Sequence, residues 1–197
     1  MIRCYDPGDA ALLKQAVDAN IEHLLPWMPW ARFEPQTLGE KVALLRTFRG
    51  QFDRGENYVY GIFTRDESEQ IGGSGFHPRA NEGSLEIGYW VAASRIGQGI
   101  ATEVTAVQTR AGFEICGLDR IDIQVEPHNE RSLKIPRKLG FTEEGTLRRR
   151  LEGVPGEPRR DSTVFTMLHE ELAGSPCLTY DYVAYDVAGN RLQRSRP

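Results

Sequence analysis

Cysteine is scarce in this chain, which has three in 197 residues: Cys4, Cys116 and Cys177. They are too few and too widely spaced for a disulfide framework, and they form no pair with the spacing of metal ligands. We therefore expect reduced thiols and no metal site. Cys116, which ends an apolar helix face, is expected to be a small buried hydrophobic residue.

Long apolar runs are also lacking. A membrane span needs about 18 consecutive apolar residues, and no stretch of the sequence approaches that length. Near the start of the chain, Asp6, Asp9 and Asp18 interrupt the segment in which a secretory signal would need its apolar core. The sequence therefore predicts a cytoplasmic protein that does not bind a membrane.

A surplus of basic residues is absent as well. The formal net charge is -4 at pH 7, whereas a sequence-independent nucleic-acid binder needs basic residues in excess to neutralise phosphates. Nucleic acid is therefore not an expected partner. The apolar share of 40% and the charged share of 26% are typical of a globular protein.

Apolar periodicity and turn residues divide the chain into elements. Helices are expected over 6–19, from Thr37 to about 55, from Ile100, and over 129–139. Strands are expected over 57–64, 70–77, 84–91, 120–125, 141–151 and 162–168. This order predicts an α+β fold with a mostly antiparallel sheet and a strand–helix–strand crossover in its middle. We expect one domain over 1–173 and a C-terminal extension over 174–197, whose extra strand pair is a candidate dimer edge before a frayed tail.

A glycine-rich turn leads from the strand over 84–91 into the helix that begins at Ile100. Backbone N–H groups in the first turn of a helix lack intrahelical partners, so a pyrophosphate is the natural ligand of this turn. A tight turn that only packs well would use the same residues. The turn lacks the Gly-Lys-Ser/Thr of a P-loop, and Thr102 stands where a dinucleotide fingerprint needs Gly or Ala.

Several motifs occur together in a fixed order. They are Leu-Leu-Pro-Trp-Met-Pro-Trp at 24–30, Glu-Ile-Gly-Tyr-Trp at 86–90, Gly-Gln-Gly-Ile-Ala-Thr-Glu at 97–103, Asn129, Ser132 and Leu-Gly-Phe at 139–141. Through these motifs, which lie within residues 1–170, the chain resembles the GNAT superfamily of N-acetyltransferases. Within it, the resemblance is to the RimJ/RimL-like branch, which includes ribosomal-protein N-terminal acetyltransferases.

The resemblance implies a GNAT-like sheet with helices on both faces and acetyl-coenzyme A as co-substrate, bound at the central crossover. Backbone amides near Trp90 and Val91 would hold the pantetheine arm and polarise the thioester, and Asn129 would reach the same arm. The hydroxyl of Ser132 would meet the departing sulfur. The pyrophosphate would be wrapped by the turn, that is by Gly97, Gln98, Gly99, Ile100, Ala101 and Thr102.

One departure from the family pattern concerns the acid that protonates the leaving thiolate. Many relatives carry a tyrosine four residues before the glycine of Leu-Gly-Phe, and here that residue is Pro136. Proline has no proton to donate, so Ser132 or water would take this role. Pro136 also removes a helix hydrogen bond to the carbonyl of Ser132 and is expected to bend the helix.

The acceptor amine must be neutral to attack a thioester. At pH 7, neutralising an α-amine with a pKa of about 7.8 costs roughly 1.1 kcal/mol, against about 4.6 kcal/mol for a lysine. A carboxylate acting through water suffices for the α-amine, and Glu86 is the first candidate, with Glu152 second. Glu86 could equally be a strand carboxylate that faces solvent or an arginine. Trp27 and Trp30 are expected to line the acceptor site.

Three functions stay open at this point. The chain acetylates a protein N-terminal α-amine, such as that of a ribosomal protein, or it acetylates a small amine such as an antibiotic, a polyamine or an amino acid. A non-catalytic coenzyme A-binding module is the third, and the loss of a tyrosine at Pro136 is its only support. An experiment with acceptors has to separate them, because acceptor-binding loops vary freely on a shared scaffold.

Overall fold

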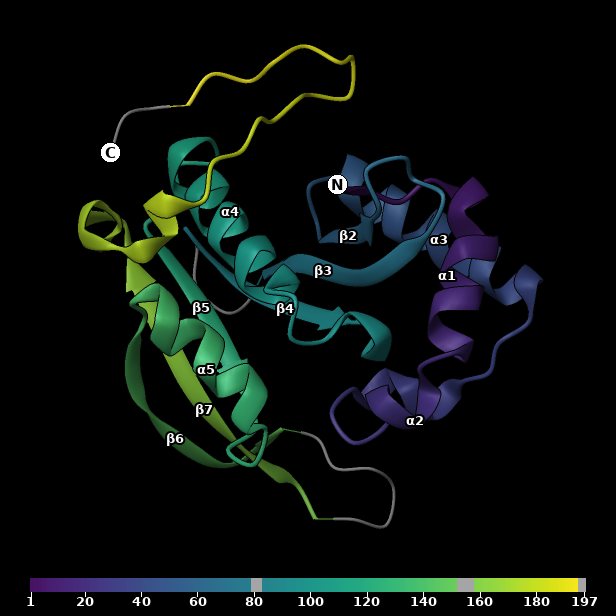
Figure 1. Ribbon diagram of the computed structural model, residues 1–197, viewed down its shortest axis with the longest axis horizontal. Coiled ribbons are helices and arrows are strands. Elements are labelled where there is room, and N and C mark those ends of the chain that lie inside the picture. Colours follow the sequence, from purple (N-terminus) through teal and green to yellow (C-terminus); the bar gives the residue numbers. More distant parts are fainter. Residues whose placement is uncertain (79–82, 152–157, 195–197) are drawn as a thin grey trace.

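The computed structural model describes residues 1–78, 83–151 and 158–194. One mixed sheet crosses the molecule, with its strands in the order β1-β2-β3-β4-β5-β7-β6 (Figure 1). The strands are Ile2–Cys4 (β1), Tyr58–Phe63 (β2), Gln70–Pro78 (β3), Ser84–Val91 (β4), Arg120–Val125 (β5), Thr142–Leu151 (β6) and Arg160–Leu168 (β7). The helices are Ala10–Asp18 (α1), Ile21–Leu24 (α2), Leu38–Asp53 (α3), Ile100–Glu114 (α4) and Glu130–Leu139 (α5). The expected α+β fold is confirmed.

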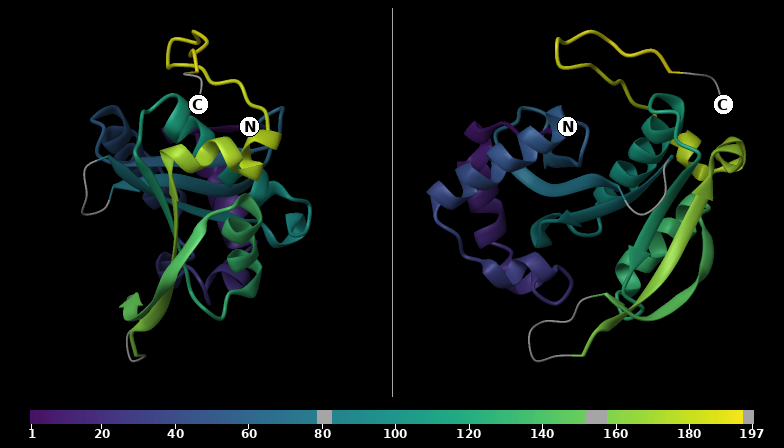
Figure 2. Two further views of the ribbon diagram at one scale, coloured as in Figure 1. Left: turned by 90° about the vertical axis from the view of Figure 1, so that its left-hand side faces the viewer. Right: turned by 180° about the vertical axis from the view of Figure 1, so that it is seen from behind.

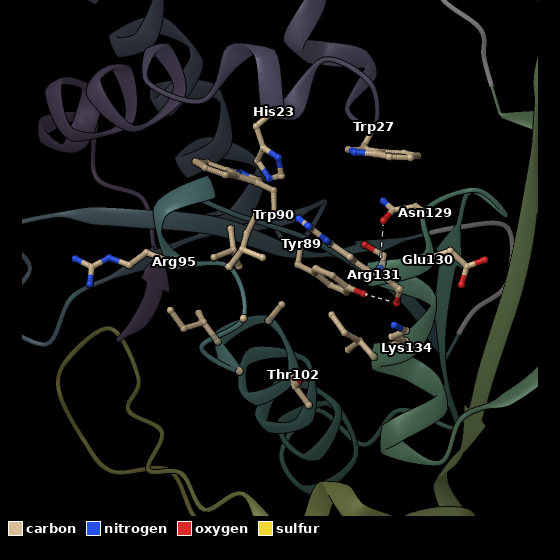
Figure 3. Close-up of a pocket in the computed structure, with 18 of the residues that line it drawn as sticks. His23, Trp27, Tyr89, Trp90, Arg95, Thr102, Asn129, Glu130, Arg131 and Lys134 are labelled. Atoms are coloured by element: carbon tan, nitrogen blue, oxygen red, sulfur yellow. Dashed lines mark hydrogen bonds between the residues drawn. The ribbon is translucent and has the colours of Figure 1, made fainter.

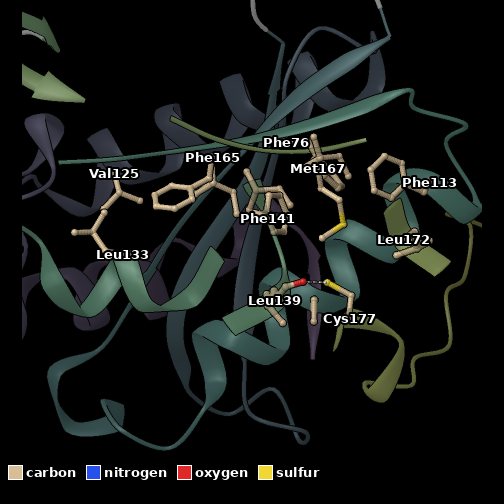
Figure 4. Packing of buried hydrophobic residues seen from close by; sticks show 14 residues of the cluster. Phe76, Phe113, Val125, Leu133, Leu139, Phe141, Phe165, Met167, Leu172 and Cys177 are labelled. Atoms are coloured by element: carbon tan, nitrogen blue, oxygen red, sulfur yellow. Dashed lines mark hydrogen bonds between the residues drawn. The ribbon is translucent and has the colours of Figure 1, made fainter. Parts of the chain in front are cut away.

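Helices cover both faces of the sheet (Figures 1 and 2). Helices α4 and α5 pack on one face over a large apolar cluster, part of which is drawn in Figure 4 and includes Phe113 and Phe165. Helices α1 and α3 pack on the other face over a second cluster that includes Leu13 and Leu45. The central strands are therefore buried on both sides, as expected of a sheet between two helical layers.

Local capping signals begin the first two long helical segments where the sequence predicts them. The Asp6 side chain caps a short 3-10 turn that leads into α1. Thr37 and Glu40 form a reciprocal capping box at the start of α3, with the Thr37 amide donating to the Glu40 carboxylate at 2.7 Å. Amides in the first turn of a helix have no carbonyl partner within the helix, and each cap side chain accepts from one of them. The start of each helix is therefore determined by residues that are close in sequence.

The expected crossover is present, because α4 connects β4 to β5 and these two strands run parallel. Their pairing covers only Ser84–Glu86, opposite residues 120–122. Strand β4 then continues to Val91 and β5 to Val125. The two strands therefore separate after three residue pairs. In the part of the chain that the structure describes, the second half of β4 has a strand partner only on its β3 side.

Some local expectations differ from the structure. The aromatic and proline-rich segment at 24–30, for which no element was predicted, joins α2 to a 3-10 helix over Pro29–Phe33. Helices of four or five residues are too short to produce a readable apolar period. Cys116 is exposed rather than buried, because it follows the last residue of α4, and Cys177 is the buried thiol.

The C-terminal extension does not form the expected strand pair within the described residues. It continues from the 3-10 helix Pro176–Thr179 to a single β-bridge between Tyr185 and Arg191. Val187 between them is 82% exposed, so no apolar burial is available to extend the pairing. None of the helices in the described ranges is long and apolar enough to cross a membrane.

One ion pair is buried under the α1 and α3 layer. The Lys41 ammonium donates to the Glu34 carboxylate, and the two side chains are 1% and 3% exposed. The Gln36 amide also donates to this carboxylate, at 3.0 Å. Removing one member of such a pair is costly, because the other charge stays buried without its partner.

We therefore expect Glu34→Gln to lower the free energy of unfolding by about 3 kcal/mol, since the Lys41 ammonium then faces a neutral amide. The double variant Glu34→Leu/Lys41→Met should lose much less, because it buries no charge. Urea unfolding followed by circular dichroism measures both. Equal losses in the two variants would contradict an electrostatic origin.

Candidate active site

A cleft of about 730 Å³ opens where the end of β4 meets the first turns of α4 and α5 (Figure 3). Its walls come from segments that are far apart in the sequence, including α2 and the residues that follow it. The residues expected from the sequence that line this cleft are Trp27, Trp90, Val91, Gly97, Gly99, Ile100, Ala101, Thr102, Asn129 and Ser132.

The backbone of β4 offers hydrogen-bonding groups to this cleft. In an antiparallel pair, successive residues turn their N–H and C=O groups to opposite edges, and the Ala92 amide donates to the Ile71 carbonyl at 2.9 Å. Trp90, two residues earlier, therefore turns its backbone groups toward β3, while those of Tyr89 and Val91 face the cleft. This geometry suits Val91 for the expected backbone contact, whereas Trp90 meets the cleft through its indole.

The glycine turn has the backbone conformation of an anion-binding site. Gly97 and Gly99 both have φ of +81°, and a Cβ at either position would meet nothing within 4 Å. Glycine is therefore required by the left-handed backbone rather than by crowding, and the space beside the turn is open. The Glu103 amide donates the first helical hydrogen bond of this turn, to the Gly99 carbonyl at 2.9 Å. The amides of residues 100–102 precede it in the first turn of α4, where an anion can take them as donors.

The first turns of α5 form the opposite wall. The Asn129 side-chain oxygen caps the helix by accepting from the Ser132 amide at 3.2 Å. Pro136 lies inside the helix and cannot donate to the Ser132 carbonyl. The Tyr89 hydroxyl donates to that carbonyl instead, at 3.3 Å (Figure 3). Burial raises the pKa of Tyr89, so the phenol keeps its proton at neutral pH and ties β4 to α5 across the cleft.

Positive charge gathers on the α5 side of the cleft. Arg131, Lys134 and Lys138 line it from one face of the helix, at i, i+3 and i+7. Arg95 also lines the cleft, but it pairs with Glu69 at 2.6 Å. The sequence motifs did not mark the α5 cations as site residues. Their helical spacing, combined with an expected helix over 129–139, was the signal that could have found them.

A second cavity of about 500 Å³ lies on the other face of the sheet, under α1 and α3. Its lining is mostly apolar and aromatic, and it shares Met28, Tyr89 and Trp90 with the first cleft. Trp30 lines this cavity and packs against Trp90 with ring centroids 6.2 Å apart. Trp27 lines the first cleft only. The two cavities therefore adjoin at the same end of β4.

Two expected site residues lie elsewhere, and a third is not described. Glu86 is 9% exposed and accepts from the Gln124 side chain at 2.8 Å, and it is not among the residues that line either cavity. It belongs to the paired end of β4, where β5 lies alongside. Gln98 is exposed, and its side chain donates to a backbone carbonyl at 3.3 Å rather than lining the cleft. Glu152 lies outside the described residues.

A sheet that separates beside an anion-binding helix start, with a second cavity reaching the same point, is the arrangement of an enzyme that joins two substrates. Residues 1–142 match the family model described as an acetyltransferase (GNAT) domain. The chain belongs to the GNAT acetyltransferase family. The resemblance recognised from the sequence motifs is confirmed.

Known relatives agree with this assignment. The uncharacterised N-acetyltransferase YoaA of Bacillus subtilis (strain 168) is 33% identical over 114 residues, which are 57% of this chain and 64%, just under two thirds, of YoaA. The ribosomal protein uS5 alanine N-acetyltransferase of Escherichia coli (strain K12) is 28% identical over 151 residues, 74% of this chain and 76% of that relative. The structure of Mycobacterium smegmatis RimJ in complex with CoA-disulfide is 29% identical, with a TM-score of 0.76 over 90% of this chain and 85% of that one.

We expect Lys134→Glu to raise the dissociation constant for coenzyme A about tenfold, because it reverses a charge in a cleft that suits phosphates. Titration calorimetry measures the change. Dephospho-coenzyme A identifies the contact: if Lys134 meets the 3′-phosphate, parent and variant should bind this analogue almost equally. Arg46→Glu makes the same charge change at an exposed position of α3 and should bind coenzyme A like the parent. An equal loss there would mean that net charge is responsible.

Proposed function

We propose that the protein transfers the acetyl group of acetyl-coenzyme A directly to the α-amine of a protein N-terminus. The observation that carries this proposal is the junction of the two cavities at Met28, Tyr89 and Trp90, beside the part of β4 that has separated from β5. The first cleft offers donors for a phosphate-bearing molecule, and the second offers room for an acceptor. Direct transfer needs both substrates at one point and no covalent enzyme intermediate.

The residues of the first cleft fit coenzyme A. Amides of residues 100–102 would hold the pyrophosphate, and Lys134 with its neighbouring cations would hold a further phosphate. Backbone groups of Tyr89 and Val91, with the side chain of Asn129, would hold the pantetheine arm. The bound molecule supplies an activated acyl group in its thioester. Amides fixed on a strand need no reorganisation to stabilise negative charge on the thioester oxygen, which is commonly a large contribution to catalysis.

An α-amine suits the second cavity chemically. It gives up its proton at roughly 1.1 kcal/mol at pH 7, so one weak base is enough. The apolar and aromatic lining would take the first side chain of the acceptor peptide. The Escherichia coli relative, by its name, acts on an alanine of ribosomal protein uS5, which is an acceptor of this class.

A polyamine fits the same cavity less well. A polycation needs several carboxylates, and among the described residues that line the second cavity Glu34 is the only one, already paired with Lys41. A small monoamine with an apolar body remains the competing acceptor, because a cavity of about 500 Å³ is large enough for it.

The test offers acetyl-coenzyme A with three sets of acceptors: peptides with free N-termini and no lysine, the same peptides with blocked N-termini and one lysine, and small amines. Thiol release and product mass are followed together. We expect thiol release and an acetylated product only with the peptides that have free N-termini. Turnover with small amines alone would replace the proposed acceptor, and binding without turnover on any amine would favour a non-catalytic coenzyme A-binding module.

Ser132 is proposed to meet the departing sulfur with its hydroxyl. We expect Ser132→Ala to lower kcat roughly tenfold while the dissociation constant for coenzyme A changes little, because a thiolate with a pKa near 8.5 leaves without full protonation. Steady-state kinetics and titration calorimetry separate the two effects. Ser68→Ala, at an exposed position of the turn between β2 and β3, serves as the matched control. Unchanged kcat in Ser132→Ala would remove this residue from the mechanism.

A further inference from the structure

His77 lies near the end of β3 and lines the second cavity. Two glycines make room for its ring. A Cβ on Gly75 would be 2.8 Å from the ring Cε1, and a Cβ on Gly88 would be 3.2 Å from the ring Nε2. Gly75 and Gly88 are direct partners in the pairing of β3 with β4. The imidazole therefore lies against the backbone of both strands, on the face that α1 and α3 cover.

Gly88 fixes the position of this ring relative to the proposed reaction site. The pairing of β4 with β5 ends at Glu86, two residues before Gly88. Tyr89 and Trp90, which follow directly, are shared by the two cavities. The Nε2 atom of His77 is thus beside the start of the strand separation, on the side from which an acceptor in the second cavity would approach.

Hydrogen bonds link His77 to Asn57 and, through Asn57, to Gln51. The Asn57 side-chain oxygen lies 2.9 Å from Nδ1. In this orientation of the amide the oxygen can only accept, which goes with the tautomer that carries its proton on Nδ1. The side-chain nitrogen of the same Asn57 donates to Gln51 Oε1 at 3.4 Å. In the neutral imidazole, Nε2 then holds a lone pair and is the basic atom.

Among the described residues around the second cavity, the other ionisable groups are bonded to neighbouring groups or are phenols that keep their protons. Glu34 and Lys41 are paired with each other. Glu86 is directly opposite His77 across β3 and β4, and its carboxylate accepts from Gln124. Three phenols keep their protons because burial raises the pKa of each: Tyr5, Tyr60 and Tyr89. An imidazole is the side chain whose ordinary pKa lies in the working range of such a base.

We infer that His77 is the catalytic base for the acceptor amine and that Asn57 is its positioning residue, an assignment that rests on the proposed acetyl transfer. The neutral amine nitrogen forms a bond to the thioester carbon, and the bond from that carbon to sulfur breaks. The nitrogen loses one proton to His77 Nε2, and the sulfur leaves as the thiolate of coenzyme A. The imidazolium then releases its proton to water, which returns the enzyme to its starting state.

The first test is the pH dependence of kcat/KM for an acceptor peptide in the parent and in His77→Gln. We expect a loss of about 10²-fold at pH 7.5 in the variant. On the acidic limb, the slope of log kcat/KM against pH should be about two in the parent and about one in the variant, because in the variant only the acceptor amine still has to be deprotonated. A merely structural role of His77 would lower activity without changing this slope.

Chemical rescue makes the assignment independent of the stability of one variant. His77→Ala leaves a space the size of an imidazole ring, and added imidazole should restore part of kcat in a concentration-dependent way. Asn57→Ala should keep the base but release its tautomer, with a fall of about tenfold and the slope retained. Coenzyme A affinity should match the parent in all these variants, which also shows that they are folded.

His169→Gln is the matched control, because His169 is exposed and packs on Phe113 outside both cavities. It should keep the parental activity and pH profile. Parental activity and an unchanged slope in His77→Gln, or loss of that slope in Glu86→Gln instead, would overturn the assignment while acetyl transfer itself stands. A parent protein that is inactive on every amine would refute the proposed function and this assignment with it.

Discussion

Strands β4 and β5 share only three residue pairs, and the rest of the site depends on this short parallel pairing. A parallel connection requires a crossover, and here α4 begins beside the end of β4, so its first amides lie next to the edge that the separation uncovers. A longer pairing would cover the backbone groups of Tyr89 and Val91. Tyr89 and Trp90, which line both cavities, lie in this part of β4. The separation therefore places the start of α4, the edge of β4 that has no strand partner among the described residues, and the two cavities next to one another.

A gap between strands persists only if the polar groups beside it have partners. Pro136 frees the Ser132 carbonyl from the α5 hydrogen-bond ladder, and Tyr89 on β4 donates to this carbonyl. The residue that interrupts the helix thus provides the acceptor for a contact that spans the cleft. The Asn129 cap holds the Ser132 amide at the same turn. Both backbone groups of Ser132 are then fixed, which defines where its hydroxyl lies relative to the strand edge.

Signals between residues close in sequence predicted most of the fold. The Asp6 cap, the Thr37 capping box and the glycine turn each follow from backbone requirements over a few positions, and the structure contains all three. Whether Glu86 faces a cavity depends on where β5 stops pairing, which no local pattern encodes. His77 and Asn57 are 20 residues apart and meet only through the register of β2 and β3. The chemistry that is hardest to find from the sequence is therefore the chemistry created by strand register.

The two cavities differ in how they treat charge. In the first cleft, the cations on α5 suit the phosphates of coenzyme A, even though the whole chain carries a net charge of -4. In the second, the Glu34 carboxylate is matched by Lys41, so these two groups leave no excess negative charge to favour a protonated amine. Under the proposed function, an acceptor in this cavity would therefore shed its proton close to the junction. The energetic cost of this step is small for an α-amine and large for a lysine, because their ordinary pKa values differ, and the proposed acceptor is the one with the smaller cost.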